Sequence, residues 1–235
     1  MHIWPLLWRV CEAPSRWYWR LRLALEVRGS QHLETGPLLL CAKHASAFDI
    51  LLIGHICRTR RRCLPHFQMG SFIGYRWLGP VSPLLRRLGG FPVMRPKEVR
   101  RLAERTGDRA AALETMRQVN DAAEATRQAV LRSGGVLVVF PEGTRDPAEL
   151  RALKATLEVE SGLAVIAAGT PVRVVPVAIS YAAARPLRRR VVVEFCAGFV
   201  PEAGATATEV LARVRAALEA RWVAPGALPR KETKP

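Results

Sequence analysis

The chain has 235 residues, of which 49% are hydrophobic, and a formal net charge of +16. This length suits a single α/β domain with at most a small appendage, and the composition allows a sizeable core. No apolar run reaches the ~20 residues needed to cross a bilayer. The N-terminus does not resemble a signal peptide, because prolines and arginines interrupt its apolar residues. Since nearly all of the excess charge is arginine, the partner is expected to be anionic: nucleic acid, a membrane face or a phosphate-bearing substrate.

The cysteines are five in number and widely spaced, at positions 11, 41, 57, 63 and 196. An odd, sparse set indicates reduced thiols in a cytoplasmic protein. One group of possible metal ligands lies close together in the sequence, but its spacing matches no standard zinc pattern: His55, Cys57, Cys63 and His66. We therefore expect no bound metal.

The first 18 residues are rich in tryptophan and arginine. A short helix is expected over residues 3–12, and its apolar face would comprise Trp4, Leu7, Trp8 and Cys11. Tryptophan favours the membrane–water boundary, and the nearby arginines would face anionic head groups. The alternative is a helix that packs on the domain's own core. We favour a segment over residues 1–18 that docks the protein peripherally on the cytoplasmic face of a membrane.

The rest of the chain alternates between strand and helix patterns. Strands are expected at residues 19–27, 37–42, 66–69, 91–94, 136–140, 172–180 and 190–196. Helices are expected at residues 47–58, 97–132 with a break at 107–108, 156–168 and 206–222, with loop and short helix over 70–90. This order predicts a single α/β domain over residues 19–223, a mixed sheet flanked by helices, followed by a disordered tail at 224–235.

The first candidate site is His44, which is followed after four residues by Asp49, directly after an expected strand. Histidine can act as a base near neutral pH, and a carboxylate on its other nitrogen would fix its tautomer. Five positions along a helix separate two side chains by ~140°, so the pair can meet only if His44 precedes the helix and Asp49 lies in its first turn. A structural alternative is that Ser46 and Asp49 form a capping box.

The second candidate site is Phe-Pro-Glu-Gly-Thr-Arg at residues 140–145, where another expected strand ends. Ligand sites in α/β sheets lie at the carboxyl ends of strands. There Gly143 would allow close approach of the backbone, Arg145 could grip a phosphate, and Glu142 could accept a hydroxyl proton or orient Arg145. A capped turn with a surface ion pair is the alternative.

Two weaker patterns complete the set. Gly89 and Gly90 precede a short strand that would place Arg95 at a strand end. Pro176 lies inside the apolar run 174–179, and a proline there indicates an edge strand or a bulge.

In this order the four patterns resemble the motifs of the 1-acylglycerol-3-phosphate O-acyltransferase family, the lysophosphatidic acid acyltransferases. The corresponding segments are residues 44–49, 90–95, 140–145 and 175–177, and the third matches the family's motif letter for letter. The resemblance spans residues 37 to 180. It implies the glycerolipid acyltransferase fold and direct transfer of an acyl group from acyl-CoA or acyl-carrier protein to the 2-hydroxyl of lysophosphatidic acid, without a cofactor or metal.

The resemblance also assigns roles to residues. His44 would be the general base and Asp49 its orienting partner. Arg95 and Arg145 would hold the acceptor's phosphate in a site shaped by Glu142, Gly143 and Thr144, and Pro176 would line the region near the acyl donor.

Three departures from the family's pattern stand out. Lys43 replaces the asparagine that commonly precedes the histidine, and could influence the titration of that base or help to hold an anionic group. Residues 159–162 lack the lysine of a Phe-Lys-x-Gly element, and the helical segment before Gly134 is longer than usual.

Two other functions stay open. The same chemistry could act on another acceptor, such as glycerol 3-phosphate or a lyso-ornithine lipid. The arginine runs at 58–62 and 185–190 could instead belong to a non-enzymatic module that binds membrane or nucleic acid. Because charge alone does not require the motif at 140–145, we expect an enzyme that binds no nucleic acid.

Overall fold

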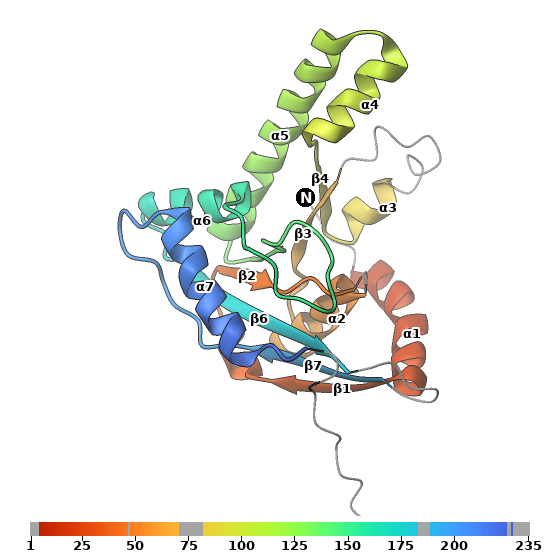
Figure 1. The fold of residues 1–235 in the computed structure, drawn as a ribbon, viewed down its shortest axis with the longest axis vertical. Coiled ribbons are helices and arrows are strands. Elements are labelled where there is room, and N and C mark those ends of the chain that lie inside the picture. The colour runs from red at the N-terminus through yellow and green to blue at the C-terminus, as the bar shows by residue number, and fades with distance from the viewer. Residues whose placement is uncertain (1–4, 47, 71–81, 183–188, 225–226, 228–235) are drawn as a thin grey trace, which may run out of the picture.

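A computed structural model describes residues 5–46, 48–70, 82–182, 189–224 and 227. Its described strands form one mixed sheet of seven strands in the order β1-β7-β6-β2-β5-β3-β4 (Figure 1). The strands are β1 (Leu23–Arg28), β2 (Leu38–Ala42), β3 (His66–Gly70), β4 (Gly90–Val93), β5 (Val136–Val139), β6 (Arg173–Tyr181) and β7 (Arg189–Phe195). The prediction of a single-domain mixed α/β sheet is confirmed.

Five neighbouring strands run in the same direction. β2 pairs in parallel with β5 and β6, and β3 pairs in parallel with β4 and β5. The β6–β7 pair is antiparallel, and β1 runs parallel to β7 at the edge. β2 and β5 are buried throughout, which explains their uninterrupted apolar sequences. The carboxyl ends of β2, β3, β4, β5 and β6 therefore share one edge of the sheet.

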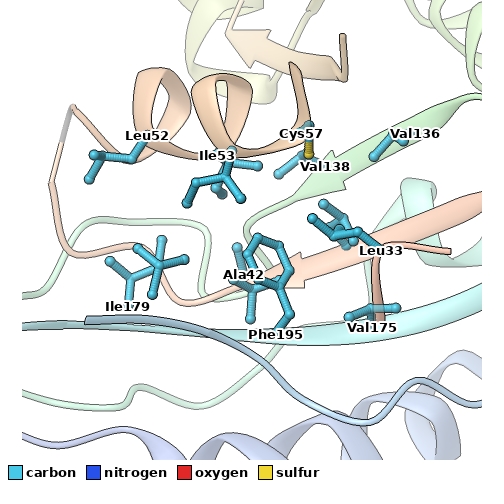
Figure 2. Close-up of a cluster of buried hydrophobic side chains, with 14 of the residues drawn as sticks. Leu33, Ala42, Leu52, Ile53, Cys57, Val136, Val138, Val175, Ile179 and Phe195 are labelled. Atoms are coloured by element: carbon cyan, nitrogen blue, oxygen red, sulfur yellow. The ribbon is translucent and has the colours of Figure 1, made fainter. Parts of the chain in front are cut away.

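Helices cover both faces of the sheet (Figure 1). One face carries α1 (Pro5–Arg22) and α2 (Asp49–Ile56), which a π-helical turn extends over Cys57–Arg61. Figure 2 shows Leu52, Ile53 and Cys57 of this layer over apolar side chains of the strands. The other face carries α5 (Arg109–Arg132), α6 (Leu157–Ala167) and α7 (Ala207–Arg221). The remaining helices are α3 (Ser82–Arg87), α4 (Pro96–Thr106) and a 3-10 turn at Ser30–His32.

The prediction of a strand from Trp19 was wrong in its first four residues, because α1 continues to Arg22 and β1 begins only at Leu23. Contacts distant in sequence hold the longer helix. Trp8 lies against Gly54 and donates from Nε1 to the Leu88 carbonyl at 2.8 Å, while the buried Glu12 accepts from Arg58 at 2.9 Å. These contacts outweigh the alternating pattern that favoured a strand.

Trp8, which we expected on the membrane-facing side of this helix, packs on the core instead. Trp8 is only 1% exposed and belongs to the main apolar cluster. Trp4 and residues 71–81 lie outside the described residues, as do residues 225–226 and 228–235 of the tail expected at 224–235. In the described part of the chain, no helix is long and apolar enough to span a membrane.

Pro176 was expected to mark an edge strand or a bulge; it is not on an edge, because β6 lies between β2 and β7, but it does lie beside a bulge. The antiparallel pairing of β6 with β7 ends next to Pro176, at the pair Val177↔Phe195. A single bridge between Val174 and Phe199 follows on the other side of Pro176. The partner side therefore contains one extra residue at this point. The Pro176 carbonyl accepts from the Cys196 amide at 2.9 Å, so the missing N–H of proline also faces this register slip.

The other elements lie within a few residues of the expected ranges. The long helical stretch breaks as predicted, because Gly107 takes a left-handed conformation (φ 74°) and Asp108 caps α5.

Candidate active site

His44 and Asp49 meet at the end of β2. His44 lies in the loop between β2 and α2, and Asp49 is the first residue of α2. Their contact joins His44 Nδ1 to Asp49 Oδ2 at 3.0 Å. The structure thus has the geometry that this spacing requires, and the pair is preformed.

Asp49 is fully buried, and its carboxylate accepts several other hydrogen bonds. Oδ2 also accepts from the amides of Ala45 and Ser46, both at 2.8 Å. Oδ1 accepts from the Tyr181 hydroxyl at 2.6 Å. Donors on both oxygens stabilise the ionised carboxylate in a buried site and fix its orientation.

Tyr181 was not found by sequence reasoning. It is the last residue of β6, 5% exposed, and 132 positions from Asp49 along the chain. Burial, followed by the adjacent Asp49 charge, raises the pKa of Tyr181, so the phenol stays protonated and donates. The only available signal was a polar aromatic residue at the carboxyl end of a buried strand.

The capping-box alternative for Asp49 is half fulfilled. Asp49 accepts from the Ser46 amide, as a capping box requires. The Ser46 hydroxyl, however, accepts from the Phe48 amide at 3.2 Å, and the N-cap residue of α2 is Phe48. The loop is thus stabilised by Asp49 while the same carboxylate orients His44.

The His44 ring stacks on Phe140, with ring centroids 4.1 Å apart. Its side chain is 16% exposed. Among the described residues no hydrogen bond reaches its Nε2. The ring is therefore held from two sides, through Nδ1 and through its face.

The segment 140–145 follows β5, which neighbours β2 in the sheet. Gly143 has φ 69°, and its amide donates to the Phe140 carbonyl at 3.0 Å, closing a tight turn. A Cβ at this position would meet no atom within 4 Å. Glycine is therefore required here by backbone conformation.

Glu142 points into the protein from this turn. Its side chain is fully buried and accepts from the Lys43 ammonium at 2.7 Å. The Lys43 ammonium also donates to the Asp146 carbonyl at 2.6 Å. Sequence reasoning expected Glu142 beside Arg145 or a substrate hydroxyl, and did not anticipate this ion pair.

The two arginines lie at the same sheet edge, but outside the interior. Arg145 is exposed and, among the described residues, makes no hydrogen bond or ion pair. Arg95 follows β4, caps α4 and pairs with the buried Glu98 at 2.7 Å, with 47% of its side chain exposed. β3 separates β4 from β5, and among the described residues no hydrogen bond or ion pair joins either arginine to the His44 side chain.

Two further predicted residues have different surroundings. Thr144 is exposed in the same loop as Arg145. Pro176 is buried in β6 opposite Cys41. Because strand side chains alternate, Pro176 lies on the face of Val174 and Ala178, which α7 covers, whereas Tyr181 lies on the α2 face.

Within the described ranges, no group of three His, Cys, Asp or Glu side chains could hold a metal ion. The site therefore consists of an oriented histidine, a buried carboxylate, and exposed guanidinium groups at the end of a parallel sheet. A histidine oriented in this way is suited to accepting a proton near neutral pH, and exposed guanidinium groups are suited to binding an anion.

A family model described as Acyltransferase matches residues 24–180, two thirds of the chain, so the chain belongs to the acyltransferase family. Among solved structures, one similar to it is the 1-acyl-sn-glycerophosphate (LPA) acyltransferase PlsC from Thermotoga maritima. The two share 17% identity with a TM-score of 0.56, over 91% of this chain and 77% of the other. This likeness establishes the fold. No curated protein matches the chain. The prediction of an acyltransferase enzyme is confirmed.

Proposed function

We propose that this acyltransferase moves a fatty acyl group from acyl-CoA or acyl-carrier protein to the 2-hydroxyl of lysophosphatidic acid, giving phosphatidic acid. The observation that carries the proposal is the 3.0 Å contact between His44 and Asp49, with His44 Nε2 unengaged among the described residues. The family match supports acyl transfer. Two arginines at the same sheet edge and the fold shared with an LPA acyltransferase support a phosphate-bearing acceptor.

The reaction then follows from the site. His44 Nε2 takes the proton of the acceptor hydroxyl, and the oxygen attacks the thioester carbonyl. The new C–O bond forms, the C–S bond breaks, and the imidazolium returns its proton to the leaving thiolate. Asp49 stabilises the imidazolium while its own charge is held by the Tyr181 hydroxyl and two amides. The proposed reaction needs no cofactor, because the acyl donor is itself a substrate.

The acceptor's phosphate is assigned to Arg145 and Arg95. A guanidinium can grip a phosphate with two parallel N–H groups, and both side chains are open to solvent. Gly143 and Thr144 belong to the same exposed turn and are proposed to shape this region, while Pro176 is proposed to act from inside the sheet near the donor. Glu142 supports the loop from the protein interior, through its ion pair with Lys43.

The proposal includes peripheral docking on the cytoplasmic face of a membrane, through a different face of α1 from the one expected. Leu6, Val10, Trp17 and Leu21 lie on one side of the helix and are 73%, 62%, 70% and 51% exposed. An exposed arginine immediately precedes each of the last three, at positions 9, 16 and 20. An apolar stripe beside a basic row suits an anionic lipid surface. The buried free thiols at 41, 57 and 196 accord with a reducing compartment.

The test of the chemistry is product detection by mass spectrometry. Purified protein is mixed with lysophosphatidic acid vesicles and palmitoyl-CoA, and separately with a palmitoyl carrier protein. Phosphatidic acid from the wild type and none from His44→Ala is the expected result. Absence of product with both donors would reject this acceptor.

An acceptor panel then separates the alternatives. Glycerol 3-phosphate, a lyso-ornithine lipid and a monoacylglycerol without phosphate are compared at equal concentration. If the arginines hold phosphate, monoacylglycerol is a poor acceptor. A rate with monoacylglycerol equal to that with lysophosphatidic acid contradicts the phosphate assignment.

Membrane docking is tested by flotation with vesicles containing phosphatidylglycerol or phosphatidylcholine alone. Trp17→Ser with Leu21→Ser is expected to lose binding to the anionic vesicles. The matched control is Leu157→Ser on α6, which is also 50% exposed but lies on the other face of the sheet. Equal loss in both variants would contradict docking through α1.

A further inference from the structure

Lys43 is a charged side chain buried beside the reacting histidine. Its side chain is 0% exposed, as is that of its partner Glu142. An isolated buried ammonium is strongly unfavourable, so a lysine persists there only with compensating partners. The proposed reaction gives this charge no direct role, and the family's pattern commonly has asparagine at this position.

The partners of Lys43 come from the loop after β5 and from the end of α7. Its ammonium donates to Glu142 Oε2 at 2.7 Å and to the Asp146 carbonyl at 2.6 Å. It also lies 5.3 Å from the ring centroid of Trp222, beyond the end of α7. The lysine therefore ties the end of β2 to both ends of the segment 142–146.

The same segment is bonded to His44 itself. The Asp146 amide donates to the His44 carbonyl at 2.9 Å, and the Phe140 ring stacks on the imidazole. Between these attachments lie Gly143, Thr144 and Arg145, all exposed and, among described residues, without side-chain partners. The position of Arg145 relative to His44 thus depends on how residues 142 and 146 are held.

We propose that Lys43 is a positioning residue, which through Glu142 and the Asp146 carbonyl holds the 142–146 loop so that Arg145 meets the anionic group of the acceptor beside His44. The acceptor part of this inference rests on the proposed function. The loop part rests on contacts within the chain and is testable without substrate.

A direct role in substrate binding fits these groups less well. The Lys43 ammonium has no exposed surface and already donates to two oxygens. Glu142 Oε1 is buried and makes no hydrogen bond among the described residues, while the ion pair balances the charge of the carboxylate. Both side chains therefore act on the acceptor through the loop that they hold.

The test compares Lys43→Met with a matched control elsewhere. Methionine keeps much of the volume and removes the charge. The control is Arg127→Met in α5, because Arg127 is also a buried cation, 1% exposed, held by Glu124, Ser161 and Gln68. A third variant, Glu142→Gln, leaves the buried ammonium without its counter-charge and serves if Lys43→Met does not fold.

The first measurement is hydrogen exchange of the peptide that contains residues 141–151, by mass spectrometry without substrate. Exchange at residues 143–146 is expected to be faster in Lys43→Met and Glu142→Gln than in the wild type, and unchanged in Arg127→Met. Unchanged exchange in Lys43→Met and Glu142→Gln overturns the proposal. Equally fast exchange in the control, Arg127→Met, also overturns it.

The second measurement is the Michaelis constant for each substrate. Lys43→Met is expected to raise KM for lysophosphatidic acid by about ten- to hundredfold and leave KM for the acyl donor within about twofold, because a small misplacement of a binding group is costly. Equal effects on both constants, or on neither, reject the positioning role. If the wild type makes no phosphatidic acid, the proposed function fails, and the exchange result still decides whether Lys43 holds the loop.

Discussion

The two halves of the candidate site differ in how completely they are formed before substrate binds. At the end of β2, His44 bonds to a carboxylate that accepts further hydrogen bonds from Ala45, Ser46 and Tyr181, and only 16% of its side chain is exposed. At the ends of β4 and β5, Arg95 and Arg145 lie on the exterior. The first half is a hydrogen-bonded network, and the second consists of two exposed arginines on surface segments, of which Arg95 is paired with Glu98.

This difference accords with the role that we propose for each half. A general base must be held in one tautomer and one orientation, and buried hydrogen bonds provide this at every moment of the reaction. A cation that receives a mobile anion must stay accessible until the anion arrives. Loss of the first half should therefore reduce kcat, whereas loss of the second should raise KM for the acceptor.

The largest effect is expected for His44→Ala. Removing the base should lower kcat by about 10³-fold or more, because general-base catalysis commonly contributes 10²–10⁴. Binding of lysophosphatidic acid should change little, since the arginines remain. Turnover by mass spectrometry and lipid binding by calorimetry test this together. Parallel loss of turnover and binding would count against His44 as the base.

Arg145→Ala should have the next largest effect. We expect KM for lysophosphatidic acid to rise by about 10- to 100-fold, consistent with about 1.5 to 3 kcal/mol for a charge-assisted contact, with kcat changed far less. Arg132→Ala, another exposed arginine, at the end of α5, is the matched control. A reduced kcat at unchanged KM would show that Arg145 acts in catalysis. It would contradict the assignment of Arg145 to acceptor binding.

The first half was largely predictable from sequence, because His44 and Asp49 are five positions apart and a strand–loop–helix turn suffices to join them. Tyr181 and the Lys43–Glu142 pair were not, since they bridge 132 and 99 positions that only the strand order brings together. The same limit explains the error at α1, where a pairing between Glu12 and Arg58 supports a helix that local alternation did not favour.

A smaller effect is expected for Tyr181→Phe. It removes one hydrogen bond to Asp49 Oδ1, while the bond to His44 and both amide donors remain. We expect kcat to fall by about three- to tenfold, which corresponds to about 0.5–1.5 kcal/mol for one hydrogen bond. Steady-state kinetics at saturating acceptor measure this. A loss as large as that of His44→Ala would show that the first half has no redundancy.

The smallest effect concerns stability, and it contrasts His44 with a second histidine. His66 begins β3, far from the edge where the strands end, and its Nδ1 is buried without a hydrogen bond among the described residues. Burial lowers the pKa of His66 to about 4. In the unfolded chain His66 takes up a proton below pH 6.5, its ordinary pKa. In the folded chain it does so only near pH 4. Stability contributed by this group is therefore lost as pH falls through that window.

Urea unfolding at pH 7.5 and pH 5 measures the loss. The free energy of unfolding should fall by about 1 to 2 kcal/mol from His66 alone, since each unit of pH within the window costs about 1.4 kcal/mol. His66→Gln should flatten this dependence without lowering kcat at pH 7.5, because the residue does not touch the site. An unchanged slope in the variant would mean that other groups set the acid limit. A reduced kcat would mean that the sheet transmits changes at the start of β3 to the histidine at the end of β2.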